Sequence, residues 1–126
     1  MFSLGTRSRA RLKGVHPDLV KVVEQAIKVS KIDFTVLEGL RTVERQKILV
    51  NSGASQTMNS RHLTGHAVDL GAWIEDEVRW DWPLYAQIND AMQKAAKELG
   101  ISIVWGGGWR TFKDGPHFEL NRKVYP

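Results

Sequence analysis

The sequence contains no cysteine, which excludes disulfide bonds, a thiolate nucleophile and any metal site with sulfur ligands. It has no apolar run near the roughly 18 residues that a membrane-spanning helix requires. Its first residues lack the apolar stretch of a secretory signal, so we expect synthesis and folding in the cytoplasm. Any metal site must therefore be built from histidine, aspartate and glutamate.

Positive charges outnumber negative ones, because 18 lysines and arginines against 14 acidic residues give a formal net charge of +4. This excess favours a polyanionic partner: nucleic acid, an anionic cell wall or an acidic lipid surface. The sequence carries no recognised nucleic-acid-binding motif, so we do not expect nucleic acid to be that partner. With 126 residues, 42% of them hydrophobic, the chain can bury one core. We expect a single domain over residues 1–126 that acts as a monomer.

Hydrophobic spacing of three and four residues predicts helices over residues 17–27 and 83–99. A third helix is expected over residues 42–50, with Thr42 as its cap. Short runs of β-branched and aromatic residues predict strands at 33–40, 67–74, 78–80, 101–105 and 117–120. Two or three helices packed against a mostly antiparallel sheet make an α+β fold.

The segments between these elements are polar or rich in glycine. Residues 52–61 predict a loop, and Gly106 to Gly108 end a strand and lead into a turn that contains Trp109 and Phe112. At the N-terminus, the basic residues of segment 7–13 predict a solvated and partly frayed end.

Two short clusters contain the densest sets of metal-binding side chains. The first, residues 60–69, has two histidines and an aspartate, and the second, residues 114–119, has a histidine between two carboxylates. A catalytic zinc ion takes three protein ligands and keeps a fourth position for water. The sequence therefore predicts that the fold brings the two clusters together around one zinc ion. The candidate ligands are His62, His66, Asp69, Asp114, His117 and Glu119.

Spacing alone does not choose among these ligands. His62 and His66 are four residues apart, which would place both on one face of a helix. However, Gly65 lies between them and Val68 follows, so a regular helix is not favoured there. The choice of histidines stays open at this point.

The pattern Ser60-x-His62-x-x-Gly65-x-Ala67-x-Asp69, followed by Asp114-x-x-His117-x-Glu119, resembles the zinc signature of a known peptidase family. That family contains D-alanyl-D-alanine peptidases, L-alanyl-D-glutamate endopeptidases and Hedgehog-like relatives. The sequence is most similar to small phage endolysins of the L-alanyl-D-glutamate type. Further similarity, at Leu37–Thr42, around Trp73 and at Trp105-Gly106-Gly107, extends the resemblance over nearly the whole chain.

The resemblance implies roles for five residues. His62, Asp69 and His117 match the zinc ligands, whereas His66 falls at a variable position and receives no role. Asp114 matches the carboxylate that acts as general base, and Arg41 matches the arginine that stabilises the oxyanion. Physical chemistry agrees, because two neutral imidazoles and one carboxylate leave the zinc positive enough to lower the pKa of bound water from about 15.7 to roughly 7.

Simpler interpretations remain for some of these side chains. The segment Asp114-Gly115-Pro116 is also typical of a turn, and Arg41 could form a surface ion pair with Glu38 or Glu44. Glu119 is expected to hold a histidine ring through its free N–H, although it could instead lie on a strand surface.

Three neighbouring residues bear on substrate binding. Trp105 and Trp109 could form a substrate wall or belong to the core. Gly108 departs from the aspartate expected before the tryptophan in related endolysins, which could alter substrate affinity without affecting the zinc site.

The function that the resemblance implies is a zinc-dependent peptidoglycan endopeptidase that cuts the L-alanyl-D-glutamate bond, with zinc-bound water as nucleophile. As a phage endolysin without a separate wall-binding domain, it would accumulate in the host cytoplasm, leave through a holin and act in the periplasm. Two alternatives remain: D,D-carboxypeptidase or dipeptidase activity on terminal D-alanines, and a non-catalytic, zinc-stabilised module that binds the wall.

Overall fold

The computed structural model describes residues 1–55, 58–110 and 113–126, so the expectation for Phe112 lies outside the described residues. Four α-helices, two short 3-10 helices and five strands make up this described part. The helices are α1 (Thr6–Arg11), α2 (Pro17–Val29), α3 (Val43–Asn51), η1 (Arg61–Thr64), α4 (Trp82–Leu99) and η2 (Gly106–Gly108). The strands are β1 (Phe34–Glu38), β2 (Ala67–Ile74), β3 (Glu77–Arg79), β4 (Ile103–Trp105) and β5 (His117–Leu120).

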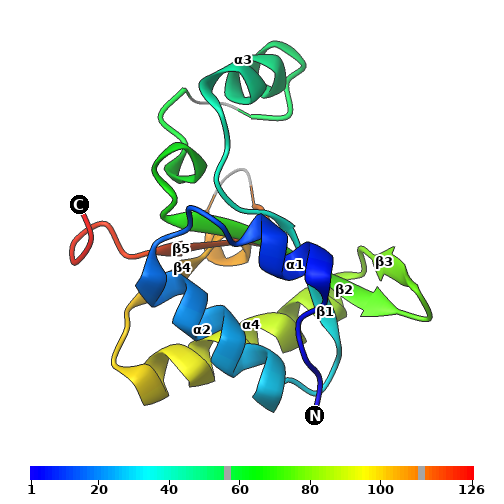
Figure 1. Cartoon of the computed structure of the whole chain (residues 1–126). Helices are drawn as coiled ribbons and strands as arrows, with labels where there is room; N and C mark the ends of the chain where they lie inside the picture. The colour runs from blue at the N-terminus through cyan, green and yellow to red at the C-terminus, as the bar shows by residue number, and fades with distance from the viewer. Residues whose placement is uncertain (56–57, 111–112) are drawn as a thin grey trace.

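These strands form one antiparallel sheet in the order β1-β2-β5-β4, with β3 paired to part of β2. Helices α2 and α4 lie side by side against one face, while α3 stands on the other side of the sheet (Figure 1). The core lies between the sheet and these two helices, where Leu19, Leu70, Ile88 and Phe118 are completely buried. The predicted α+β class is confirmed.

The predicted helix starts have identifiable caps. The His16 ring accepts a hydrogen bond from the Asp18 amide at 3.1 Å and thereby caps α2. The Thr42 hydroxyl accepts one from the Arg45 amide at 3.1 Å and caps α3. The remaining predicted helix, α4, begins at Trp82, one residue before the predicted start.

Strand β1 is shorter than predicted, because the structure ends it at Glu38 and leaves Leu40 outside the sheet and 50% exposed. The last two residues of the predicted strand instead lead directly into α3, which places Arg41 at the expected strand-to-helix junction.

The prediction of a frayed N-terminus was wrong, because α1 forms there and packs on β1, an edge strand. The Val36 amide donates to the Ser8 hydroxyl at 3.0 Å, and Arg11 donates to the Val36 carbonyl at 2.9 Å. Side chains of α1 thus satisfy backbone groups that an edge strand would otherwise leave unpaired. Hydrophobic spacing missed this helix because it contacts the strand mainly through polar groups.

Candidate metal centre

The first half of the site is built on the short helix η1. The Ser60 hydroxyl accepts a hydrogen bond from the His62 amide at 3.2 Å and caps the helix. Gly65 ends it with a left-handed φ of 75°. A Cβ at this position would lie only 2.4 Å from the Gly14 carbonyl oxygen, so both backbone conformation and space require glycine.

Spacing did not show which of His62 and His66 is a metal ligand. Because η1 ends at Gly65, the two histidines lie in different environments. His66 lies beyond the helix, where its Nδ1 is 2.7 Å from the Thr64 hydroxyl and its ring packs 5.5 Å from that of His16. His62 is instead buried and faces β2. The two rings therefore do not share a helical face. Of the two, only His62 belongs to the set of described residues that could hold a metal ion, namely His62, Asp69 and His117, here called the metal-binding group.

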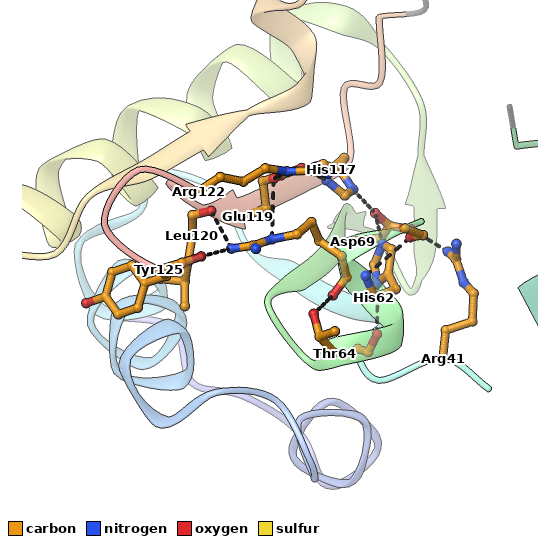
Figure 2. A network of polar contacts seen from close by, with 12 residues as sticks. Arg41, His62, Thr64, Asp69, His117, Glu119, Leu120, Arg122 and Tyr125 are labelled. Atoms are coloured by element: carbon orange, nitrogen blue, oxygen red, sulfur yellow. Dashed lines mark hydrogen bonds and ion pairs between the residues drawn. The ribbon is translucent and has the colours of Figure 1, made fainter. Parts of the chain in front are cut away.

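The sheet supplies the second half of the site. Pairing of β2 with β5 places Asp69 directly opposite His117, although the two residues are 48 positions apart in the chain. Asp69 Oδ1 lies 3.2 Å from His62 Nε2 and 3.4 Å from His117 Nδ1 (Figure 2). One ligand atom from each of the three residues lies within 4.8 Å of the others. This arrangement can hold a metal ion.

Hydrogen bonds on the far side of each ring determine which nitrogen faces the centre. His62 Nδ1 lies 2.8 Å from the Gly39 carbonyl, and His117 Nε2 lies 2.9 Å from Glu119 Oε1. Carbonyl and carboxylate oxygens only accept, so these ring nitrogens carry the protons. When a ring is neutral, its other nitrogen presents a lone pair beside the Asp69 carboxylate; when the ring is charged, that nitrogen donates to Asp69 instead. Three electron-rich atoms around one point fit a cation, and imidazole and carboxylate are ligands that zinc accepts.

The pKa values of His117 and Asp69 show how strongly these two side chains interact. Burial disfavours a charged His117, but hydrogen bonds to Asp69 and Glu119 outweigh burial and raise the pKa of this ring to about 9. Burial raises the pKa of Asp69, but hydrogen bonds to His117 and His62 outweigh it and hold this pKa well below its usual range. A proton and a metal cation therefore compete for the lone pair of His117.

Glu119 connects the site to the C-terminal segment (Figure 2). It is buried, and its second oxygen lies 3.8 Å from Arg61 Nε and 3.4 Å from Arg122 Nε. Arg61 also donates to the carbonyls of Leu120 and Tyr125, at 3.2 and 2.6 Å. The predicted contact between Glu119 and a histidine ring is present, and the surface alternative was wrong.

Arg41 is held with its guanidinium directed at the cluster. Its side chain is only 8% exposed, donates to Glu38 through Nε and donates to Gln46 through Nη1 at 2.7 Å. Nη2 lies 3.7 Å from Asp69 Oδ2. The alternative ion pair with Glu38 does form, but it is partly buried and positions the guanidinium beside the metal-binding group.

Asp114 is held by a turn next to η2. Its amide donates to the Gly106 carbonyl at 3.1 Å, and its own carbonyl accepts from the His117 amide at 3.2 Å. A Cβ at Gly106 would lie 2.5 Å from the Asp114 carbonyl oxygen, so glycine permits this close packing. Burial raises the pKa of the Asp114 carboxyl, and the nearby charge of Asp69 adds to the effect. A carboxylate with a raised pKa is a better proton acceptor near neutral pH.

A pocket of about 700 Å³ opens over the centre, and its lining includes Arg41, Asp114 and all three residues of the metal-binding group. Trp109 also lines it, with its ring 5.0 Å from that of His117. Trp105 does not line it; its indole donates to the Gly115 carbonyl at 2.8 Å and stacks on Phe118. Of the two tryptophans, only Trp109 is thus placed to contact a substrate.

Sequence reasoning missed several polar residues at the site. The pocket is also lined by Arg61, Arg110 and Arg122, which no motif singled out. The hydroxyl of Tyr85 is buried and has no hydrogen-bond partner among the described residues. Burial and the charges of Asp114 and Asp69 raise the pKa of this phenol to about 12, which keeps it neutral. Tyr85 falls on the buried face of α4, the one signal that could have identified it.

Comparisons with known proteins agree on one family. The sequence profile of the family described as "Phage L-alanyl-D-glutamate peptidase" matches residues 1–125. The L-alanyl-D-glutamate peptidase of Escherichia phage T5 is 34% identical over 128 residues, which cover 98% of this chain and 93% of that protein.

Solved structures show the same relationship in three dimensions. The crystal structure of the Serratia marcescens L-Ala D-Glu endopeptidase ChiX is 53% identical and superposes with a TM-score of 0.92, over 96% of this chain and 91% of that one. The vancomycin-resistance D,D-dipeptidase VanXYg is 20% identical with a TM-score of 0.57, over 84% of this chain and 50% of that one. The latter similarity shows a shared fold.

Proposed function

Because the chain belongs to the phage L-alanyl-D-glutamate peptidase family, we propose that it is a zinc-dependent endolysin that cuts the L-alanyl-D-glutamate bond of peptidoglycan. The observation that carries this proposal is the convergence of three ligand atoms beneath an open pocket. The opposite nitrogens of both histidine rings are already engaged by Gly39 and Glu119, which is the arrangement of metal-binding imidazoles.

His62, Asp69 and His117 would hold the zinc ion. When bound, zinc supplies a positive charge that acidifies water and polarises the scissile carbonyl. The short helix η1 and the β2–β5 ladder position these three side chains. Their role is therefore to provide a rigid set of two neutral nitrogens and one anionic oxygen.

Asp114 and Arg41 would act on the substrate. Asp114 takes a proton from the attacking water and returns it to the leaving amine of D-glutamate, a task that its raised pKa favours. Arg41 donates to the oxyanion that develops on the L-alanine carbonyl, and its contacts with Glu38 and Gln46 keep it in that orientation.

Mass spectrometry of digested peptidoglycan, combined with metal analysis of the purified protein, tests the proposal. New peptides with N-terminal D-glutamate and one zinc per chain are the expected result. Release of D-alanine would instead indicate D,D-carboxypeptidase or D,D-dipeptidase activity, and an intact wall would indicate a binding module.

The two neighbouring histidines offer a matched pair of variants. His62→Ala is expected to lose zinc and wall cleavage, whereas His66→Ala is expected to keep both, because its ring contacts Thr64 and His16 outside the metal-binding group. Loss of zinc in both variants would contradict the proposed ligand set.

The endolysin role adds a requirement for access to the wall. No helix in the described residues is long and apolar enough to span a membrane. If the chain is an endolysin that reaches the wall through a holin, its expression alone should leave host cells intact, and co-expression with a holin should lyse them. Lysis by the chain alone would contradict dependence on a holin.

A further inference from the structure

The arginines around the pocket fall into two groups. Arg41 and Arg61 have side chains that are 8% and 10% exposed, and each is engaged by hydrogen bonds to neighbouring protein groups. Arg122, by contrast, has a side chain that is 62% exposed, and Arg110 is also exposed. Among the described arginines of the pocket, the second pair is therefore the more exposed and presents guanidinium groups that an incoming substrate could reach.

The position of Arg122 relative to the metal-binding group is well defined. Its Nε lies 3.4 Å from Glu119 Oε2, and the other oxygen of Glu119 holds the His117 ring at 2.9 Å. Figure 2 shows the side chain of Arg122 extending beside Glu119 toward His117. Glu119 is also paired with Arg61, so Arg122 is not required to balance its charge.

The charge of the pocket suits an anionic ligand. Four arginines and four acidic residues line it, so their formal charges cancel. With one neutral ring nitrogen of each histidine serving as a ligand, a zinc ion would add two positive charges. The pocket would then carry a net positive charge, concentrated at the metal and at the exposed arginines.

The proposed substrate supplies an anion close to the bond that breaks. A glutamate residue has two carboxyl groups, and the peptide can continue through only one of them. The other remains as a free carboxylate within a few bonds of the scissile nitrogen. Guanidinium groups bind carboxylates through two parallel hydrogen bonds, which gives both affinity and geometric selectivity.

We propose that Arg122, together with Arg110, forms a subsite that binds the free carboxylate of the D-glutamate residue and so selects this residue on the leaving-group side of the cleaved bond. The inference rests on the proposed function, because it assigns a specificity determinant to the same pocket. It explains how a site with general peptide-cleaving chemistry could distinguish D-glutamate from a neutral D-amino acid.

The test compares two synthetic stem peptides that differ only at this carboxyl group, which is free in one and converted to the amide in the other. Wild-type protein is expected to cleave the free acid with a kcat/KM about 10-fold higher, in line with one charge-assisted hydrogen-bonding contact at a partly exposed site. Arg122→Gln and Arg110→Gln are each expected to lower kcat/KM for the acid, mainly through KM. Cleavage of the amide should change little, so the preference should approach unity.

Controls separate recognition from structural damage. Arg79→Gln removes an exposed arginine of β3 that pairs with Asp81 outside the pocket, and it should keep the wild-type preference. Arg122→Lys keeps the charge without the two-pronged geometry and should restore part of the preference. Zinc content and the visible spectrum of the cobalt-substituted protein should match wild type in the Arg122 variants, because Arg61 still pairs with Glu119.

The outcomes distinguish this inference from the function on which it rests. Equal cleavage of acid and amide by wild type, or an unchanged preference in both glutamine variants, would overturn the subsite while leaving the endopeptidase intact. Failure of wild type to cut either peptide, or peptidoglycan itself, would overturn the proposed function. Loss of preference in at least one glutamine variant, with normal zinc binding, would support the subsite.

Discussion

Replacement of Glu119 tests whether the contacts behind the histidines matter for metal binding. Glu119 Oε1 accepts the Nε2 hydrogen of His117 at 2.9 Å, in a position that is only 6% exposed. In Glu119→Gln, an amide oxygen can still accept this hydrogen, but the bond loses its ionic character. In Glu119→Ala, the acceptor is gone and the ring is free to turn.

The expected magnitudes follow from these contacts. A hydrogen bond to a charged group contributes about 1.5–3 kcal/mol and a neutral one about 0.5–1.5 kcal/mol, so the glutamine variant should lose about 1.4 kcal/mol, or 10-fold in zinc affinity. Complete removal of such a partner typically costs 10- to 100-fold, and the buried position of Glu119 places the alanine variant at the upper end.

Competition with a chromophoric chelator would measure the zinc dissociation constants of both variants. Glu24→Gln, on the exposed face of α2, is the matched control and should change affinity less than twofold. Because Arg61 would lose its anionic partner, thermal unfolding of the metal-free variants must be measured alongside. Wild-type zinc affinity in a folded Glu119→Ala protein would refute the reasoning, since it would mean that Glu119 does not hold the His117 ring for the metal.

Three further predictions address the base, the glycine turn and pH. Asp114→Asn should bind zinc normally but cleave peptidoglycan at least about 100-fold more slowly, as digestion and metal analysis would show, because the proton acceptor is lost. Gly65→Ala should lower the free energy of unfolding, measured in denaturant titrations, by about 3 kcal/mol, because the new Cβ would clash with the Gly14 carbonyl at a position whose φ is left-handed. Gly100 has a similar φ but open space around it, so Gly100→Ala should lower the same free energy by only about 1 kcal/mol. Metal-free protein should lose stability as pH rises from about 6.5 to about 9, because His117 binds its proton more tightly in the folded protein than in the unfolded chain. Saturating zinc displaces that proton and should abolish the trend. Thermal unfolding at a series of pH values, with and without zinc, would measure both effects.

Local pattern was a good guide wherever one segment determines its own structure. Strand β2 occupies the predicted residues 67–74, and β5 occupies 117–120, because the apolar and aromatic residues that favour a strand lie within each short segment. Thr42 and Gly100 mark helix ends through hydrogen bonds and φ angles that depend on immediate neighbours. The missed helix α1 depends on contacts with β1, about 25 residues away.

The sequence by itself determined the α+β class, the separation of the ligands into two clusters and, through family resemblance, the roles expected of His62, Asp69 and His117. The resemblance already gave His66 no role, and the tertiary structure adds the physical reason: η1 ends at Gly65, which packs against Gly14, and the His66 ring lies beyond that end.

The surroundings of the metal-binding group were decided only by tertiary structure. The β2–β5 register places Asp69 opposite His117. Glu119, which contacts the His117 ring, also pairs with Arg61 and Arg122. Side chains far apart in the chain converge only after the core has fixed the sheet and its helices. Periodicity records which face of an element is buried, but it does not record which distant side chains share the resulting pocket.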